Sequence, residues 1–67
     1  MKIKWTNRYS GESGYVAAID EVGRHFINAA DIKDACIYRQ TRTAEKVIDK
    51  LYEFGEGDNN DFEIVKG

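Results

Sequence analysis

The side chains that most often carry out chemistry are few in this chain, and their spacing does not bring them together. His25 is the only histidine, and no serine, cysteine or carboxylate has a spacing that forces it next to the imidazole. General acid–base catalysis needs a second group within hydrogen-bonding distance. We therefore expect His25 to be structural or exposed to solvent.

The sequence contains no pattern that is typical of a metal or cofactor site. Asp58–Asp61 is rich in oxygen ligands, but it lacks the glycine and the late glutamate of a calcium-binding loop. Gly11 and Gly14 come before a predicted strand, whereas a phosphate-binding loop is followed by a helix. Cys36 is the only cysteine, so one chain can form neither a disulfide nor a cysteine-based zinc site. We predict no catalytic residues, no metal, no cofactor and no enzymatic activity.

The length and composition indicate a single small domain. The chain has 67 residues without a linker or repeat, and we assign residues 1–67 to one domain. A domain of this size buries little apolar surface, which keeps a homodimer open as an alternative to a monomer. No apolar run has the length of a signal peptide or a membrane span, so we expect a cytoplasmic protein without membrane contact.

The charge is unevenly distributed along the chain. The net charge is −2, which gives no general case for binding nucleic acid or an anionic membrane. Residues 1–50 contain nine basic and seven acidic side chains, whereas residues 51–67 contain one lysine and five carboxylates. The sequence therefore predicts an acidic C-terminal segment attached to a mildly basic body.

The longest periodic pattern predicts one amphipathic helix over about residues 43–54. Apolar side chains recur there at helical spacing and form one stripe: Ala44, Val47, Ile48, Leu51 and Tyr52. Thr41 or Thr43 can cap the first turn. Gly55 is suited to end the helix in a left-handed conformation.

Five shorter segments have the composition or alternation of strands: Met1–Trp5, Tyr15–Asp20, Arg24–Asn28, Cys36–Arg39 and Phe62–Val65. Short turns join the first three, which favours an antiparallel meander. Asn28 or Asp31 can cap a turn over 30–35, and the pattern leaves open whether that turn is helical. We predict an α+β fold, a mostly antiparallel sheet of about four to five strands in the order β-β-β-β-α-β, with the helix on one face. The helical connection also allows a parallel crossover between the last two strands.

A single helix covers only one face of such a sheet, and no second layer is available for the other face. In the second predicted strand, Tyr15, Ala17 and Ile19 alternate with Val16 and Ala18, so apolar side chains lie on both faces. Apolar surface that is left uncovered marks a site for a partner or for self-association.

Aromatic and basic residues in the first forty positions suggest an alternative function. The aromatic members are Trp5, Tyr9, Tyr15 and Tyr38, and the basic members include Lys2, Lys4, Arg8, Arg24 and Arg39. Sheet aromatics next to arginines stack single-stranded bases in small domains. However, Trp5 shares a face with Met1 and Ile3, which favours a core position. The alternative function is single-stranded nucleic-acid binding through the sheet aromatics and the arginine and lysine side chains.

Several short segments resemble small uncharacterised phage and mobile-element proteins of bacteria. The similar segments are Lys4–Asn7 with Ser10–Glu12, Ala44–Lys46, and Gly55–Glu56 with Asn59–Ile64. These proteins form no functionally defined family, so the resemblance assigns no site residues. It implies a category, because small phage-borne proteins often bind and block a host protein such as a defence nuclease.

We therefore predict a small non-enzymatic protein-interaction module, an inhibitor or regulator of a host protein. The candidate partner-binding residues combine the first turn with the acidic segment: Arg8, Tyr9, Glu56, Asp58, Asp61 and Glu63. Tyr9 lies beyond the alternation of the first strand in a polar context, which favours an exposed position.

Overall fold

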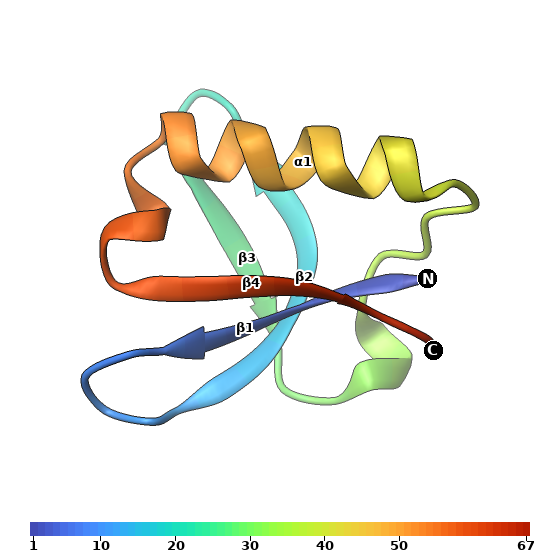
Figure 1. Cartoon of the computed structure of the whole chain (residues 1–67), viewed down its shortest axis with the longest axis horizontal. Helices are drawn as coiled ribbons and strands as arrows, with labels where there is room; N and C mark the ends of the chain where they lie inside the picture. Colours follow the sequence, from blue (N-terminus) through green and yellow to red (C-terminus); the bar gives the residue numbers. More distant parts are fainter.

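The computed structural model of the protein describes residues 1–67. The elements along the chain are strands β1 (Lys2–Asn7), β2 (Ser13–Asp20) and β3 (His25–Ala29), the 3-10 turn η1 (Ile32–Asp34), helix α1 (Thr41–Glu53), the 3-10 turn η2 (Glu56–Asp58) and strand β4 (Asn60–Val65). The four strands form one sheet in the order β3-β2-β1-β4, and every neighbouring pair is antiparallel. Helix α1 lies along one side of this sheet (Figure 1). The predicted α+β fold with one helix is confirmed.

The core is small and lies between α1 and the two central strands. Four side chains are fully buried: Ile3 of β1, Val16 of β2, and Ala44 and Leu51 of α1. Removing such side chains from water is the main favourable term in folding. The apolar stripe predicted for the helix thus supplies two of the four core residues.

The sheet is curved, so that its two edge strands approach each other on the helix side. Phe26 belongs to edge strand β3 and Phe62 to edge strand β4, yet their ring centroids lie 5.6 Å apart with an interplanar angle of 85°. Three strand spacings place the edges of a flat sheet roughly 14 Å apart. The curvature therefore brings the rings into an edge-to-face contact that two ends of a flat sheet do not make.

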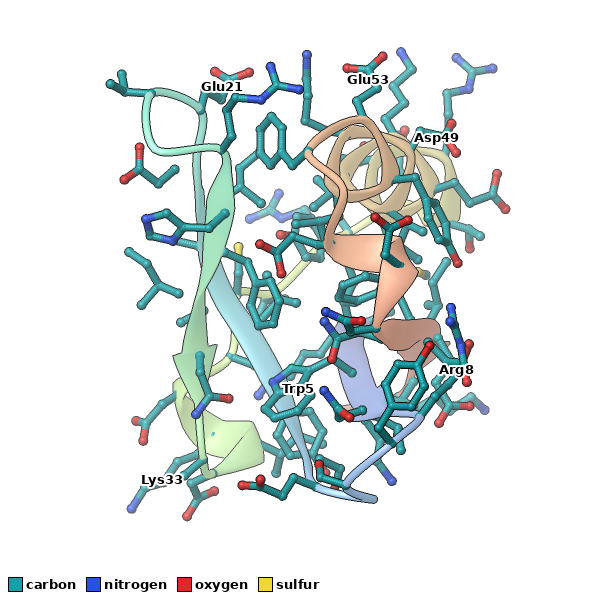
Figure 2. All side chains as sticks on the ribbon, turned by 90° about the vertical axis from the view of Figure 1, so that its left-hand side faces the viewer. Trp5, Arg8, Glu21, Lys33, Asp49 and Glu53 are labelled. Carbon is teal, nitrogen blue, oxygen red and sulfur yellow. The ribbon has the colours of Figure 1, made fainter.

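Trp5 continues this aromatic row across the middle of the sheet. Its ring lies 5.9 Å from that of Phe26, and its Nε1–H donates to Asn28 Oδ1 at 2.8 Å. Trp5 belongs to β1 and Asn28 to β3, and strand β2 lies between them. The indole therefore crosses β2, and it does so at Gly14, the residue that pairs with Trp5 in the β1–β2 ladder. A Cβ at Gly14 would lie 2.8 Å from Trp5 Nε1, which is too close for a side chain there. Figure 2 shows Trp5 between the β3 side and the β1 side of the fold.

The strict alternation predicted for β2 is wrong. The pairing with β3 shifts register between Val16 and Ala18, as in a β-bulge that inserts one extra residue into one strand. Val16 is buried in the core, and Ile19, which alternation assigns to the other face, also packs against the core. The bulge leaves Ala18 next to Ile27 on the outer face of the sheet.

The strand predicted over Cys36–Arg39 does not form. Tyr38 exchanges two backbone hydrogen bonds with Met1, with N–O distances of 2.7 and 2.8 Å, and the Cys36 N–H donates to Val16 O at 3.0 Å. The segment therefore bridges the two central strands without becoming part of the sheet. The helix leads instead to β4, which pairs antiparallel with β1, so the parallel crossover is also absent.

Helix α1 begins two residues and ends one residue earlier than the predicted range of 43–54. Gln40 is its N-cap residue and makes no side-chain cap, so the predicted capping by Thr41 or Thr43 is wrong. The Gln40 carbonyl accepts from the backbone N–H groups of Thr43 and Ala44, which closes the first turn. Gly55 follows the helix with a φ of +89°, the left-handed conformation that glycine adopts without strain.

The outer face of the sheet, which the sequence predicts to be uncovered, is partly covered at one end. Asp31 caps η1 by accepting from the Lys33 N–H at 3.0 Å, so this short turn is helical. Lys2 Nζ donates to the Ile32 carbonyl at 2.5 Å, and Lys2 is only 4% exposed. Ile27 of β3 remains 51% exposed, so the bare apolar surface lies on the β3 side.

The close contact of the Trp5 ring with Gly14 predicts that a methyl group added at position 14 destabilises the fold. We expect Gly14→Ala to lower the free energy of unfolding by about 1–3 kcal/mol, because the new Cβ displaces the indole from Asn28. Ala18→Ser is the matched control, since Ala18 is exposed on the same strand. Denaturant unfolding followed by tryptophan fluorescence measures both variants. Equal free energies of unfolding for the two variants would contradict the crossing of the Trp5 indole over Gly14.

Candidate functional site

The Arg8 side chain holds the acidic segment in one conformation. Its Nε–H donates to Asp61 Oδ1 at 2.9 Å, and its Nη1–H donates to Asp58 O at 2.8 Å. Its Nη2–H groups donate to the carbonyls of Asn60, at 3.2 Å, and Gly57. We call Arg8 with these four residues the Arg8 clamp. A planar guanidinium with several fixed donors is well suited to such a role.

The sheet places the two halves of the clamp opposite each other. The pairing of β1 with β4 runs as far as Asn7 and Asn60, and the Arg8 N–H then donates to Asn59 O at 2.9 Å. Asn60 is buried, and its Nδ2–H donates to Glu56 O at 3.0 Å, which fixes η2 against the start of β4. The clamp therefore forms where the antiparallel ladder ends.

Tyr9 extends from a tight turn that directly follows Arg8. Asn7 Oδ1 accepts from the N–H groups of both Tyr9 and Ser10 at 2.9 Å, and the Asn7 carbonyl accepts from the Gly11 N–H. Gly11 has a φ of +78°, which the turn requires and glycine tolerates. The Tyr9 side chain is 79% exposed, so a fixed backbone presents a large aromatic ring to solvent.

Tyr52 of α1 lies at the same site, although its place in the apolar stripe predicted burial. It is 50% exposed, and its ring makes an edge-to-face contact with Phe62 at a centroid distance of 6.0 Å. Its ring also lies against Gly57, where a Cβ would overlap it. The only sequence signal for this position is the glycine five residues later, which leaves room for the ring.

Both tyrosines adjoin the Arg8 clamp, because Tyr9 follows Arg8 in the sequence and the Tyr52 ring lies against Gly57, whose carbonyl accepts from Arg8. The hydrogen bond to Asp61 is the main cause that raises the pKa of Arg8, and the Tyr9 and Tyr52 phenols add smaller contributions of the same sign. We call Tyr9 and Tyr52, together with the Arg8 clamp, the tyrosine surface. Figure 2 shows Arg8 on the side of the molecule opposite β3.

The structure brings most of the predicted partner-binding residues together. Arg8, Asp58 and Asp61 belong to the clamp, Tyr9 is adjacent to it, and Glu56 opens η2. Because the Arg8 charge is engaged by Asp61, it is not a free basic group. None of the carboxylates of Glu56, Asp58 and Glu63 forms an ion pair.

Glu63 lies further along β4, opposite Lys4 of β1. It is therefore at the margin of the tyrosine surface rather than within it.

The aromatic residues of the nucleic-acid alternative do not share one face. Trp5 lies on the helix side of the sheet, in contact with Phe26. Tyr15 pairs with Lys4 in the ladder and lies on the outer face. Tyr38 is bonded to Met1 through its backbone, and burial raises the pKa of its phenol, with a further increase from the neighbouring Cys36.

His25 forms part of a hairpin. Its Nε2 lies 3.3 Å from Asp20 Oδ2, and its Nδ1 lies 3.2 Å from Phe26 O. Asp20 Oδ1 accepts from the N–H groups of Val22 and Gly23 at 3.0 and 2.9 Å. The Gly23 bond is the main cause that lowers the pKa of Asp20, and the His25 charge and the Val22 bond lower it further. The Asp20 carboxylate and the His25 imidazole therefore stabilise the β2–β3 turn.

The clamp predicts local loosening when Arg8 is removed. In Arg8→Ala we expect the amide of Asp58, which donates to Gly55 O at 3.2 Å, to exchange with solvent several-fold faster. Arg42→Ala is the matched control, because the Arg42 side chain is exposed on α1 and forms no ion pair. Hydrogen exchange followed by NMR measures the effect. Unchanged exchange in Arg8→Ala would contradict the clamp.

The lowered pKa of Asp20 predicts a contribution to acid sensitivity. A carboxyl whose pKa is lower in the folded chain stabilises the fold above the unfolded-state pKa of about 3.9, and this stabilisation is lost as pH falls through the folded pKa. Asp20→Asn keeps an oxygen that can cap the turn but does not titrate. We expect the wild type to lose more stability than Asp20→Asn below about pH 4. Parallel curves of urea midpoint against pH would contradict this assignment.

The remaining surface gives no further site of a recognised kind. The structure has no pocket and no group of three or more side chains that could hold a metal ion. None of its helices has both the length and the apolar character needed to span a membrane. Comparisons with models of protein families, with curated proteins and with solved structures give no significant match.

Proposed function

We propose that this protein is a non-enzymatic interaction module that binds a partner protein through the tyrosine surface. The observation that carries the proposal is the exposure of two aromatic side chains next to one fixed arginine. Tyr9 and Tyr52 are 79% and 50% exposed. Tyr9 directly follows Arg8, and the Tyr52 ring lies against Gly57, whose carbonyl accepts a hydrogen bond from Arg8. Tyrosine and arginine are enriched among the residues that contribute most to protein–protein affinity.

The rigidity of the surface supports this proposal. Association loses affinity when side chains and loops have to be ordered on binding. Here the Arg8 clamp already orders the acidic segment, and Asn7 orders the turn that carries Tyr9. A tyrosine has only two side-chain torsions to fix, so it provides contact area at a low entropic cost.

The charge of the surface favours a basic partner. Asp61 is paired with Arg8, whereas the carboxylates of Glu56 and Asp58 have no ion-pair partner. Unpaired carboxylates at the rim of an interface speed up association with a positively charged surface and disfavour acidic ones. The resemblance to mobile-element proteins favours a host protein, such as a defence nuclease, which the module inhibits by occupying its surface.

The proposal predicts that one alanine substitution strongly weakens partner binding. We expect Tyr9→Ala to weaken binding about thirtyfold, the loss typical of a residue that contributes about 2 kcal/mol. Val22→Ala is the matched control, because Val22 is 96% exposed on the β2–β3 turn, outside the tyrosine surface. Affinity capture from a host lysate with both variants, followed by titration of the captured protein, measures the difference.

Two results would contradict the proposed function. One is the recovery of no protein other than the bait itself. The other is equal capture by Tyr9→Ala and the wild type while circular dichroism shows that both are folded, because the partner would then bind elsewhere.

A further inference from the structure

Strand β3 is an uncovered edge of the sheet on the side of the molecule opposite the tyrosine surface. It ends the strand order, and Figure 2 shows no ribbon beyond it. An edge strand presents unpaired backbone N–H and C=O groups that can pair with another strand. Its sequence, His25–Ala29, contains no lysine, glutamate, aspartate or proline, which are the residues that usually prevent such pairing.

The other edge of the sheet differs in this respect. Strand β4 carries the acidic side chains of Asp61 and Glu63, and the Arg8 clamp is bonded to its first residues. On β3 the corresponding outer-face position is Ile27, an apolar side chain that is 51% exposed and lies next to the exposed Ala18. The two edges therefore differ in charge and in apolar exposure, and only β3 has the character of a pairing surface.

We propose that two copies of this chain associate through antiparallel pairing of their β3 strands. A two-fold axis near Ile27 places this side chain against its own copy and joins the two four-stranded sheets into one. Such an interface is small, so we expect a transient dimer with micromolar affinity. This association is independent of the proposed function, because it uses a different surface and a different partner.

One pair of charged side chains, Glu21 and Lys33, can form a contact between two copies in the antiparallel direction. Figure 2 shows Glu21 and Lys33 at opposite ends of this edge. Their side chains are exposed, and their partners within the chain lie at the long distances of 3.7 Å, to Lys50, and 4.0 Å, to Asp31. An antiparallel pair brings Glu21 of each copy toward Lys33 of the other, whereas a parallel pair brings like charges together.

The other charged groups at the Glu21 end of β3 are engaged within their own chain. Asp20 is held by the turn and by His25, and the Arg24 guanidinium donates to Glu53 O at 2.8 Å and lies over the Phe54 ring. Arg24 adds positive charge at the Glu21 end of β3.

The other end adds negative charge through Asp31, the N-cap residue of η1, and Asp34, the last residue of η1. The antiparallel arrangement places this end opposite Arg24 of the second copy. Each end therefore carries both signs. The charges permit the two-fold arrangement, but the symmetry of two identical edges sets it.

Sedimentation velocity over a concentration series tests the association. We expect the wild type to change from monomer to dimer between micromolar and millimolar concentration, and Ile27→Lys to remain monomeric throughout. Ile37→Lys is the matched control, because Ile37 is exposed outside β3, and we expect it to dimerise like the wild type. Circular dichroism checks that both variants are folded.

A charge exchange tests the two-fold geometry. Glu21→Lys alone and Lys33→Glu alone each place like charges together twice in the dimer, and we expect each to weaken it about tenfold. The double variant restores opposite charges and is expected to recover most of the wild-type affinity.

Three results would overturn the proposal. They are a wild type that stays monomeric at millimolar concentration, a dimer that survives Ile27→Lys but not Ile37→Lys, and a double charge variant that is weaker than either single one. None of these results bears on partner capture through Tyr9, so the two proposals fail separately.

Discussion

The fold depends on the requirement that one helix and four short strands enclose a core within 67 residues. Only four side chains are fully buried in the core, so the sheet cannot remain flat and still exclude water from its helix side. It curves until aromatic rings from both edge strands meet over the centre, with Phe26 against Phe62. Gly14 permits this closure, because the absence of a side chain lets Trp5 cross β2 and reach Asn28.

The same curvature determines where the two surfaces lie. Closing β4 over the helix side brings Phe62 against Tyr52, which leaves Tyr52 half exposed beside the Arg8 clamp. The opposite edge, β3, contributes Phe26 to the core and leaves Ile27 facing solvent. The tyrosine surface and the β3 edge, on opposite sides of the molecule, therefore both result from the curvature of the sheet.

Periodicity predicted the fold class and the helix because these depend on local spacing. The stripe through Ala44 and Leu51 and the stop at Gly55 are confirmed. The bulge in β2 could not be predicted, because its sequence alternates normally and the extra residue appears only in the pairing with β3. Cys36–Arg39 has the composition of a strand, but the two central strands already pair with each other and with the edges, so the segment only bridges them.

The candidate site was predictable in part for the same reason. Arg8, Tyr9 and the acidic segment are marked by their charge and polar context, and the structure brings most of them together. What they do there depends on contacts about fifty residues apart in the sequence, such as that between Arg8 and Asp61. No local pattern reveals that Arg8 is bound by its own chain. Nor does one reveal that Tyr52, a member of the apolar stripe, is half exposed beside the Arg8 clamp.

The curvature that joins the two edge strands is the central claim, and one measurement tests it directly. A nuclear Overhauser spectrum of the monomer at low concentration reports which aromatic rings are in contact. The structure predicts direct cross-peaks between the ring protons of Phe26 and Phe62, whose centroids lie 5.6 Å apart. Cross-peaks from each ring only to its own strand and neighbouring strand, with none between the two, would contradict the account.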